Sequence, residues 1–274
     1  MYFFLNFYSL VLRFSPKFIV KFNDYLVFSL LFHIFRIRRN MVDKNLSIAF
    51  PGLLKKERYL IAKKCYKFFA QEMVDLIRGT FWQNTSGVRF QNIKILEEAL
   101  GHKKGVLLVG GHLGAFDKAF ASIKNQGYNI SGVAYKQNNK GFDLYFKKIR
   151  ENFFSKQLYR GNDLKEILNL LKNNEIVVLL SDQNARKKGV DVNFFGHQCS
   201  TFSGAAVLHK RTGAPIICFD IIKHDEEYCV YFKKINENNS KDISTIIQDY
   251  TLAIEASIKK APSQYFWFHN RWRN

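Results

Sequence analysis

Hydrophobic positions recur along the chain with two different periods. Between residues 55 and 78 they return every three or four positions, which predicts a long amphipathic helix. Unbroken apolar runs at 105–112 and 175–181 are short and end in Gly or Ser, which predicts two buried strands. The same criteria predict helices at 92–100, 115–125, 142–155, 163–173, 203–211 and 243–259, and strands at 130–135, 215–222 and 228–235.

This alternation of strands and helices predicts an α/β fold: a mixed, largely parallel central sheet flanked by helices. The chain has 274 residues, of which 47% are hydrophobic, enough for the core of one large domain. We find no internal repeat and no low-complexity linker after residue 40. We therefore expect one continuous domain over residues 41–274, preceded by a distinct N-terminal segment of residues 1–40.

Residues 1–40 are dominated by apolar and aromatic side chains and end in the basic cluster Arg36, Arg38 and Arg39. The longest clean apolar stretch, 25–32, falls short of the roughly 20 residues that a spanning helix needs. A signal peptide also fits poorly, because the basic start and the cleavage site are missing. We favour a helical membrane-anchoring segment that lies in the lipid interface, with its arginines on anionic lipid. A helical hairpin packed on the domain and a true span remain alternatives.

Composition narrows the class of partner. The chain carries 42 Lys and Arg against 23 Asp and Glu, a net charge of +19, and 16% of its residues are aromatic. Such a protein is expected to meet phosphates, an acidic protein or a lipid surface. We find no nucleic-acid-binding motif and expect no nucleic acid as partner. The four cysteines lie far apart, without the spacing of a zinc site or a disulfide framework, so we expect no metal.

The stretch GGHLGAFD at 110–117 carries the candidate chemistry. His112 follows a buried strand, where open α/β sheets place their sites, and Asp117 follows in the first turn of the next helix. There the carboxylate can hold one ring nitrogen of His112 and leave the other free as a general base for a substrate hydroxyl. Gly110, Gly111 and Gly114 would let the backbone approach a ligand closely. A purely structural histidine is the alternative.

Four segments together resemble a known family. The His-x4-Asp pattern resembles the signature of the lysophospholipid acyltransferase superfamily. NLSIAFPGLLKKER at 45–58, the block at 160–204 and QYFWFHNRW at 264–272 resemble, in the same order, segments of the lipid A biosynthesis lauroyl/myristoyl acyltransferases, the late acyltransferases of Gram-negative bacteria. Four matches in order are far more specific than the His-x4-Asp pattern alone.

This resemblance implies an acyltransferase domain over residues 41–274 that works at the cytoplasmic face of the inner membrane. The reaction would move a fatty acyl chain from acyl-acyl carrier protein to a hydroxyl of a (Kdo)2-lipid IVA-type lipid A precursor, without a cofactor. His112 would act as the base and Asp117 would orient it. The positive charge would suit the acidic carrier protein, the phosphates of the acceptor and inner-membrane lipid.

Further residues complete the expected site. Backbone N–H groups near the Gly-rich turn or an arginine would stabilise the oxyanion on the thioester carbonyl, and Arg160 is the arginine we favour. Asp182 ends a buried strand at the same sheet edge as His112 and could pair with Arg186 or Lys187. For each of these a loop or packing role is the alternative. The substrate-binding residues we expect are Gly110, Gly111, Gly114, Arg150, Asp182, Gln183, Arg186, Phe195 and Thr201.

Three other functions compete with this hypothesis. A glycerophospholipid acyltransferase of the 1-acylglycerol-phosphate type would use the same His-x4-Asp pattern on a smaller acceptor. A basic membrane-surface protein without enzymatic activity would satisfy the charge and the aromatic content. A metal-dependent hydrolase is disfavoured, because no HxH, HExxH or DxD spacing occurs.

Overall fold

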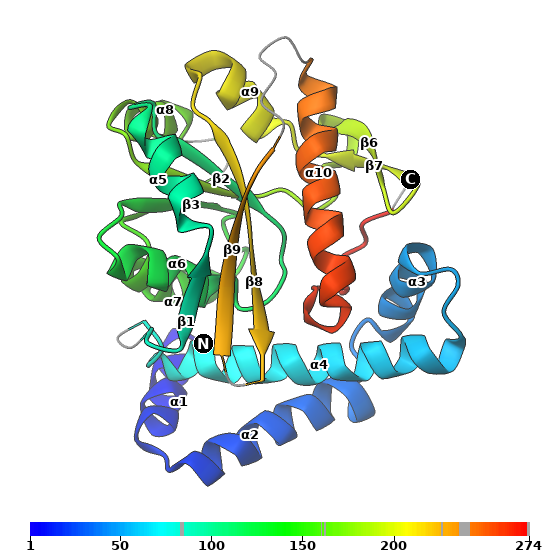
Figure 1. Ribbon diagram of the computed structural model, residues 1–274. Helices are drawn as coiled ribbons and strands as arrows, with labels where there is room; N and C mark the ends of the chain where they lie inside the picture. Colours follow the sequence, from blue (N-terminus) through cyan, green and yellow to red (C-terminus); the bar gives the residue numbers. More distant parts are fainter. Residues whose placement is uncertain (83–84, 160, 162, 226, 236–241, 273–274) are drawn as a thin grey trace.

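The computed structural model describes the chain except residues 83–84, 160, 162, 226, 236–241 and 273–274 (Figure 1). The strands are β1 Val88–Gln91, β2 Val106–Gly110, β3 Ile130–Ala134, β4 Lys156–Tyr159, β5 Ile176–Leu180, β6 Val190–Phe194, β7 His197–Thr201, β8 Ile216–His224 and β9 Glu227–Lys234. The α-helices are α1 Tyr2–Phe14, α2 Lys17–Ser29, α3 Arg39–Ala49, α4 Lys55–Arg78, α5 Ile93–Gly101, α6 Phe116–Asn125, α7 Lys140–Phe153, α8 Leu164–Lys172, α9 Gly204–Thr212 and α10 Ile243–Lys260. A π-helical turn, η1 Leu30–Ile34, extends α2, and η2 Arg186–Lys188 and η3 Pro262–Gln264 are 3₁₀ turns.

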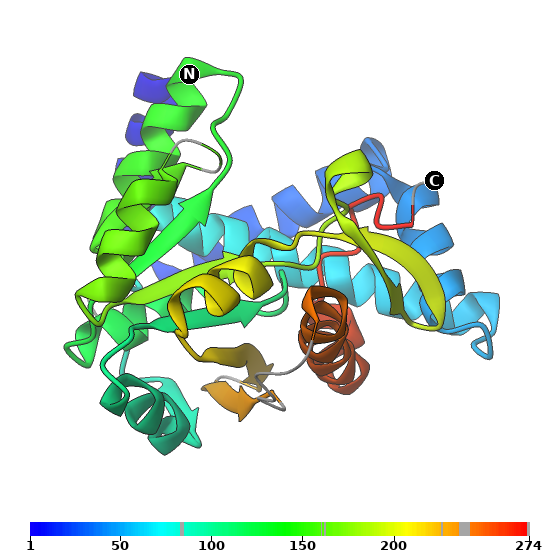
Figure 2. The same cartoon turned by 90° about the horizontal axis from the view of Figure 1, so that it is seen from above.

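Seven strands form the central sheet in the order β1-β9-β8-β2-β5-β3-β4. Within the described chain, β8 and β9 pair antiparallel and the other pairs of this sheet are parallel. Helices cover the sheet, and Figure 2 shows α10 and the β6–β7 hairpin on the side opposite α5. The expected mixed, largely parallel sheet flanked by helices is therefore confirmed.

The central strand β2 explains why two cores form. All five of its residues are buried, and their side chains alternate between the two faces of the sheet. Leu107 and Val109 belong to a core shared with α4, α8, α9 and α10. Val106 and Leu108 belong to a second core shared with α5, α6 and α7, to which α1 contributes Leu5.

Most predicted elements lie within a few residues of the observed ones, but four strands were not predicted. β1 and β4 are the two edges of the sheet and have four residues each, of which β1 has none and β4 only one buried. β6 and β7 form a separate two-stranded hairpin in a segment to which no element was assigned from the sequence. Edge and hairpin strands bury little apolar surface, so they lack the unbroken apolar run that marked the central strands.

The long helix α4 lies across the lower end of the sheet in Figure 1. Its first turn is closed by the Glu57 carboxylate, which accepts a hydrogen bond from the backbone N–H of Leu54 at 2.7 Å. It ends at Gly79, whose left-handed backbone (φ +67°) is typical of a helix C-cap. The apolar face of α4, including Cys65 and Tyr66, packs into the first core.

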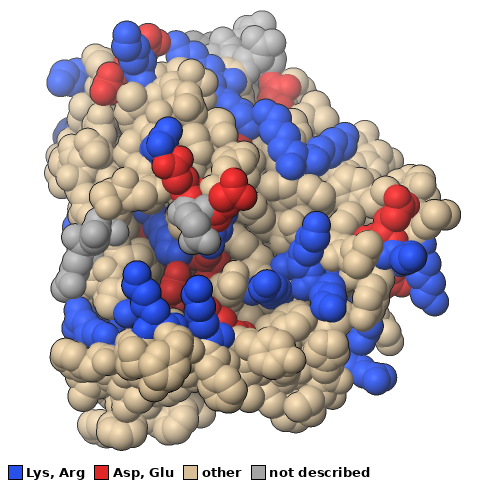
Figure 3. Space-filling view, turned by 60° about the horizontal axis from the view of Figure 1, so that its bottom comes forward, with Lys and Arg blue, Asp and Glu red and all other residues tan. Residues whose placement is uncertain are grey.

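The helices α1 and α2 each carry two apolar faces, one packed on α4 and one exposed. Leu12 of α1 and Val20 of α2 pack on Val74 of α4 in a small core of their own. The opposite faces expose large apolar side chains at helical spacing, namely Phe3, Phe7, Leu10, Phe14, Phe18, Phe22 and Tyr25. Figure 3, which brings the underside of Figure 1 forward, shows a broad uncharged surface along its lower edge with Lys and Arg side chains above it.

Within the described residues, no single helix is both long and apolar enough to cross a bilayer. The helical stretch Lys17–Ile34 and α3 meet that criterion only together, and they are bent by 85° against each other. The membrane-anchoring role of residues 1–40, and their separation from residues 41–274 as a unit, therefore stay predictions.

Candidate active site

His112 and Asp182 face each other because two parallel strands end side by side. β2 and β5 pair so that Gly110 lies opposite Leu180, which brings the residues two positions further on to the same sheet edge. Asp182 then binds His112 twice. Its Oδ2 accepts the backbone N–H of His112 at 2.9 Å, and its Oδ1 lies 2.7 Å from the ring Nδ1.

The environment favours the ionised carboxylate of Asp182. Its side chain is only 3% exposed, against 24% for His112. Burial by itself raises the pKa of Asp182, but the charge and hydrogen bonds of His112, with a further contribution from Arg271, lower it to about 2. In return, the pKa of His112 is raised, because the Asp182 carboxylate outweighs the opposing effect of burial.

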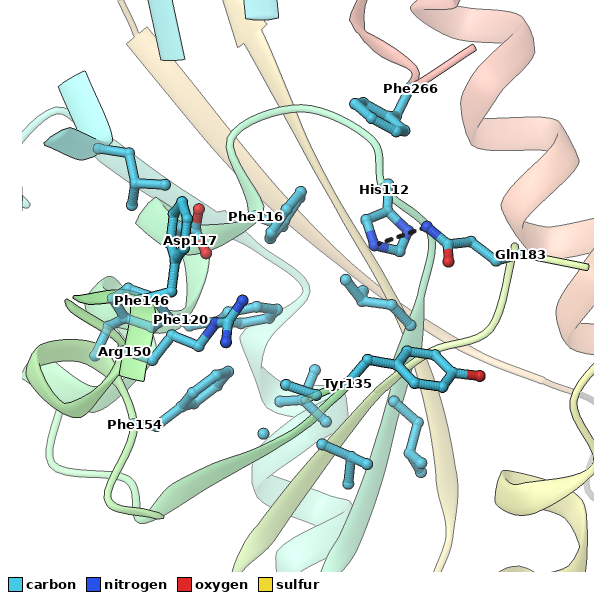
Figure 4. A pocket seen from close by; sticks show the side chains of 18 of the residues that line it. His112, Phe116, Asp117, Phe120, Tyr135, Phe146, Arg150, Phe154, Gln183 and Phe266 are labelled. Atoms are coloured by element: carbon cyan, nitrogen blue, oxygen red, sulfur yellow. Dashed lines mark hydrogen bonds between the residues drawn. The ribbon is translucent and has the colours of Figure 1, made fainter. Parts of the chain in front are cut away.

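This pairing fixes the tautomer of a neutral His112. A carboxylate at 2.7 Å from Nδ1 requires the proton on that nitrogen. Nε2 is then the atom with a free lone pair, and Nε2 of Gln183 lies 3.5 Å from it (Figure 4). The geometry is that of a general base held by a buried carboxylate, which can accept a proton from a hydroxyl within hydrogen-bond reach of Nε2.

A cavity of about 1190 Å³ opens beside His112. Most of its wall residues are aromatic or aliphatic. Phe116, Phe120 and Phe154 are among them, and α1 contributes Leu5. The ring of His112 meets that of Phe116 edge to face, with centroids 5.5 Å apart. A volume above the range of about 300–1,000 Å³ for small-molecule sites suits a long apolar ligand.

Asp117 is not the carboxylate that binds the His112 ring, contrary to the expected arrangement. No hydrogen bond joins the two side chains in the described chain, and Phe116 lies between them in Figure 4. The reason is that the turn after β2 points Asp117 toward Arg150, another residue of the cavity wall. Burial raises the pKa of Asp117 to about 6, although the charge of Arg150 opposes this shift. Asp117 still acts on His112 through its charge, which raises the histidine pKa.

The glycines of this turn serve the protein's own packing more than a ligand. A Cβ at Gly110 would lie 2.5 Å from the ring of Phe219, and one at Gly114 would lie 1.7 Å from the carbonyl oxygen of Ile221. Gly114 also has a left-handed backbone (φ +66°) and lines the cavity, whereas Gly110 and Gly111 do not. The turn is thus pressed against β8, which sets the position of His112.

The remaining predicted residues divide by location. Gln183 and Arg150 line the cavity. Arg186 is exposed and does not pair with Asp182, because His112 occupies that carboxylate. Phe195 and Thr201 are buried away from the cavity, where Phe195 packs on Trp267 and Thr201 accepts a hydrogen bond from Arg271. Arg160 lies outside the described residues.

The C-terminal segment supports the site, a role that the sequence left open. Arg271 is buried and its charge lowers the pKa of Asp182, while burial and then the charge of the same carboxylate raise the pKa of the buried Tyr265. The backbone N–H of Phe266 donates to the carbonyl of His112 at 3.0 Å. The only signal for these contacts in the sequence was the segment QYFWFHNRW, which gives no spatial partner. Within the described chain, no three His, Cys, Asp or Glu side chains are arranged to hold a metal ion.

Comparison with known proteins gives the reaction class. A family model described as bacterial lipid A biosynthesis acyltransferase matches residues 1–274, the whole chain. The chain belongs to this family. It is therefore an acyltransferase of lipid A biosynthesis, and the expected family resemblance is confirmed.

Relatives with curated names agree with this assignment. The chain is 23% identical over 249 residues to the lipid A biosynthesis palmitoleoyltransferase of Escherichia coli (strain K12), a match that covers 86% of this chain and 79% of the relative. It is 24% identical over 246 residues to the lipid A biosynthesis lauroyltransferase of the same organism, with the same coverage. A lipid A biosynthesis acyltransferase of Shigella flexneri is 23% identical over 249 residues.

The turn that carries His112 should not tolerate a side chain at Gly114. We expect Gly114→Ala to lower the free energy of unfolding by more than about 3 kcal/mol, since it combines a left-handed backbone with a clash against β8. Gly127→Ala is the matched control, because Gly127 has φ +90° but open space around it, and it should cost only about 1–2 kcal/mol. Urea unfolding measures both. Equal losses would show that the contact with Ile221 does not matter.

The two carboxylates should affect the ionisation of His112 unequally. Asp182→Asn should lower the pKa of His112 strongly, because it removes both the charge and the charged hydrogen bond at Nδ1. Asp117→Asn should lower it less, because it removes a charge alone. NMR titration of the imidazole in each folded variant measures the shifts. A larger shift in Asp117→Asn would return the orienting role to Asp117.

Proposed function

We propose that this acyltransferase moves a fatty acyl chain from acyl-acyl carrier protein to a hydroxyl of a (Kdo)2-lipid IVA-type lipid A precursor. The observation that carries the proposal is that Nε2 of His112, the nitrogen left without a proton, lies at the wall of a large apolar cavity. A base of this kind suits a hydroxyl acceptor, and an apolar cavity suits the acyl chain of the donor. The names of the relatives and of the family support the acceptor class.

The proposed chemistry is a direct transfer. His112 Nε2 takes the proton from the acceptor hydroxyl while the oxygen attacks the thioester carbonyl carbon. The tetrahedral intermediate then expels the thiolate of the carrier, and His112 returns the proton to that sulfur. Asp182 holds the ring and stabilises its protonated form, as the carboxylate of a catalytic triad does. Asp117 supports the same protonated form through its charge, and Arg160 stays our candidate for the oxyanion.

The carrier protein is proposed as the form of the donor on electrostatic grounds. The net charge of +19 favours an acidic protein over a small neutral donor. Exposed lysines on α7 (Lys147 and Lys148) and basic residues in and next to η2 (Arg186 to Lys188) offer contacts for such a partner.

We propose that the protein acts at the cytoplasmic face of the inner membrane. The exposed aromatic side chains of α1 and α2 would enter the interfacial layer, and Arg13, Lys17 and Lys21 would meet anionic headgroups. This arrangement lies on the membrane without crossing it, and it brings α1, which lines the cavity with Leu5, to the lipid surface.

A transfer assay in detergent tests the reaction. The purified protein is mixed with acyl-acyl carrier proteins that carry acyl chains of several lengths and with a tetra-acylated Kdo2-lipid A precursor. The mass of the product is measured by mass spectrometry. We expect a gain of one acyl group, and a rate at least about 100-fold lower for His112→Ala, the usual scale for losing a general base. His197→Ala is the matched control, since His197 is exposed on β7, and it should keep the wild-type rate.

Other outcomes of this assay separate the alternatives. Acylation of a lysophospholipid in place of the lipid A precursor would support the glycerophospholipid acyltransferase. Transfer from acyl-coenzyme A at the same rate would remove the carrier protein from the proposal. Full activity of His112→Ala would exclude the base assignment.

Vesicle binding tests the membrane surface. The triple substitution Phe7→Ser, Phe14→Ser and Phe18→Ser should weaken binding to anionic phospholipid vesicles at least about tenfold, because each buried Phe contributes about 2 kcal/mol. The fold should persist, since all three rings are exposed. Leu144→Ser with Leu252→Ser, two exposed apolar positions on other helices, is the control. Unchanged sedimentation of the triple variant with vesicles would contradict an interfacial α1–α2 surface.

A further inference from the structure

Three arginines converge beside the cavity where the N-terminal helices turn into α3. Arg36, Arg38 and Arg39 line a surface depression together with Asn40 and Met41. Arg36 and Arg38 both have left-handed backbone (φ 46° and 53°), which makes the sharp turn between η1 and α3. We name these three side chains the arginine cradle.

The positive charge of the cradle is not balanced locally. Within the described chain, no carboxylate forms an ion pair with any of the three arginines. Arg39 stacks on the rings of Phe32 and Tyr59, at 4.7 and 5.3 Å from their centroids, so its orientation is fixed. Three fixed or clustered guanidinium groups without a protein anion are a suitable receptor for an external one.

The cradle is continuous with the catalytic cavity. Arg38 lines both the depression and the cavity beside His112. Its guanidinium donates to the carbonyl of Phe268 at 2.8 Å, and Phe266, two residues before it, donates its N–H to the carbonyl of His112. A ligand held at Arg38 therefore sits on the strip of backbone that supports the base.

The residues around the arginine cradle indicate that its ligand is an amphiphile. Ile34, Phe35 and Ile37 alternate with the arginines and are exposed. Apolar side chains that project beside arginines fit a molecule whose anionic head lies at a lipid surface. Arg prefers phosphate, whose oxygens match its planar array of N–H donors.

We propose that the arginine cradle binds a phosphate group of the acceptor lipid and so positions the acceptor hydroxyl at His112. This assignment rests on the proposed function, because it presupposes a phosphorylated glycolipid acceptor. The cradle then determines acceptor specificity, while the chemistry stays with His112.

Removing the phosphate tests the proposal directly. Purified protein in nonionic detergent receives either the phosphorylated acceptor or the same lipid after phosphatase treatment. We expect Arg36→Gln and Arg38→Gln each to raise KM for the phosphorylated acceptor about tenfold more than KM for the dephosphorylated one. Lys172→Gln, which removes an exposed charge on α8, is the control and should alter neither.

Equilibrium binding of the two lipids is measured in parallel, so the result does not depend on turnover. Discrimination between the two lipids that is lost in both variants supports the cradle even if no transfer occurs, an outcome that would refute the proposed function alone. An equal rise of KM for both lipids would overturn the cradle. So would a loss confined to binding of phosphatidylglycerol micelles, which would assign the arginines to bulk lipid.

Discussion

The double contact between Asp182 and His112 organises this protein. One carboxylate fixes both the backbone and the ring of the histidine, and it joins the ends of the two central parallel strands. Buried carboxylates are costly unless they are paired and hydrogen-bonded, so the surroundings must supply partners. His112 supplies the hydrogen bonds, and Arg271, far along the chain from Asp182, adds a positive charge that favours the ionised carboxylate. His112, the sheet edge and the C-terminal segment are consequently one structural unit.

The same constraint explains the long reach of the C-terminal segment. Its backbone carbonyls are held by donors from three elements: Cys65 of α4 binds Tyr265, Asn45 of α3 binds Trp267 and His269, and Arg38 binds Phe268. Figures 1 and 2 both show the C-terminus beside α3. The N-terminal and C-terminal parts of the chain thus meet beside the site, and hydrogen bonds satisfy the carbonyls of a segment that has little regular secondary structure.

Sequence patterns predicted the core of the fold and the sheet edge at which His112 lies, but not the carboxylate that binds its ring. Buried parallel strands carry unbroken apolar runs, so β2, β5 and the sheet class were visible, whereas β1 and β4 were too short and too exposed. The carboxylate predicted to bind His112 was that of Asp117, the nearest acid along the chain. Asp182 was expected at the same edge, yet the register of β2 against β5 that brings it to Nδ1 cannot be read from one sequence. The effect of Arg271 on Asp182 could not be predicted, because only the complete tertiary fold brings the two residues close together.

Leu5 restricts which residues the inner face of α1 can carry. An exposed apolar helix face can usually exchange one apolar residue for another in the course of evolution, because no neighbouring side chain restricts its size. On α1 this freedom ends at the inner stripe, where Leu5 is part of the cavity wall. In a cavity that holds an acyl chain, residue size at that stripe sets the available length. Two members of the family with identical surroundings of the histidine can therefore differ in the shape of this cavity through their first dozen residues alone.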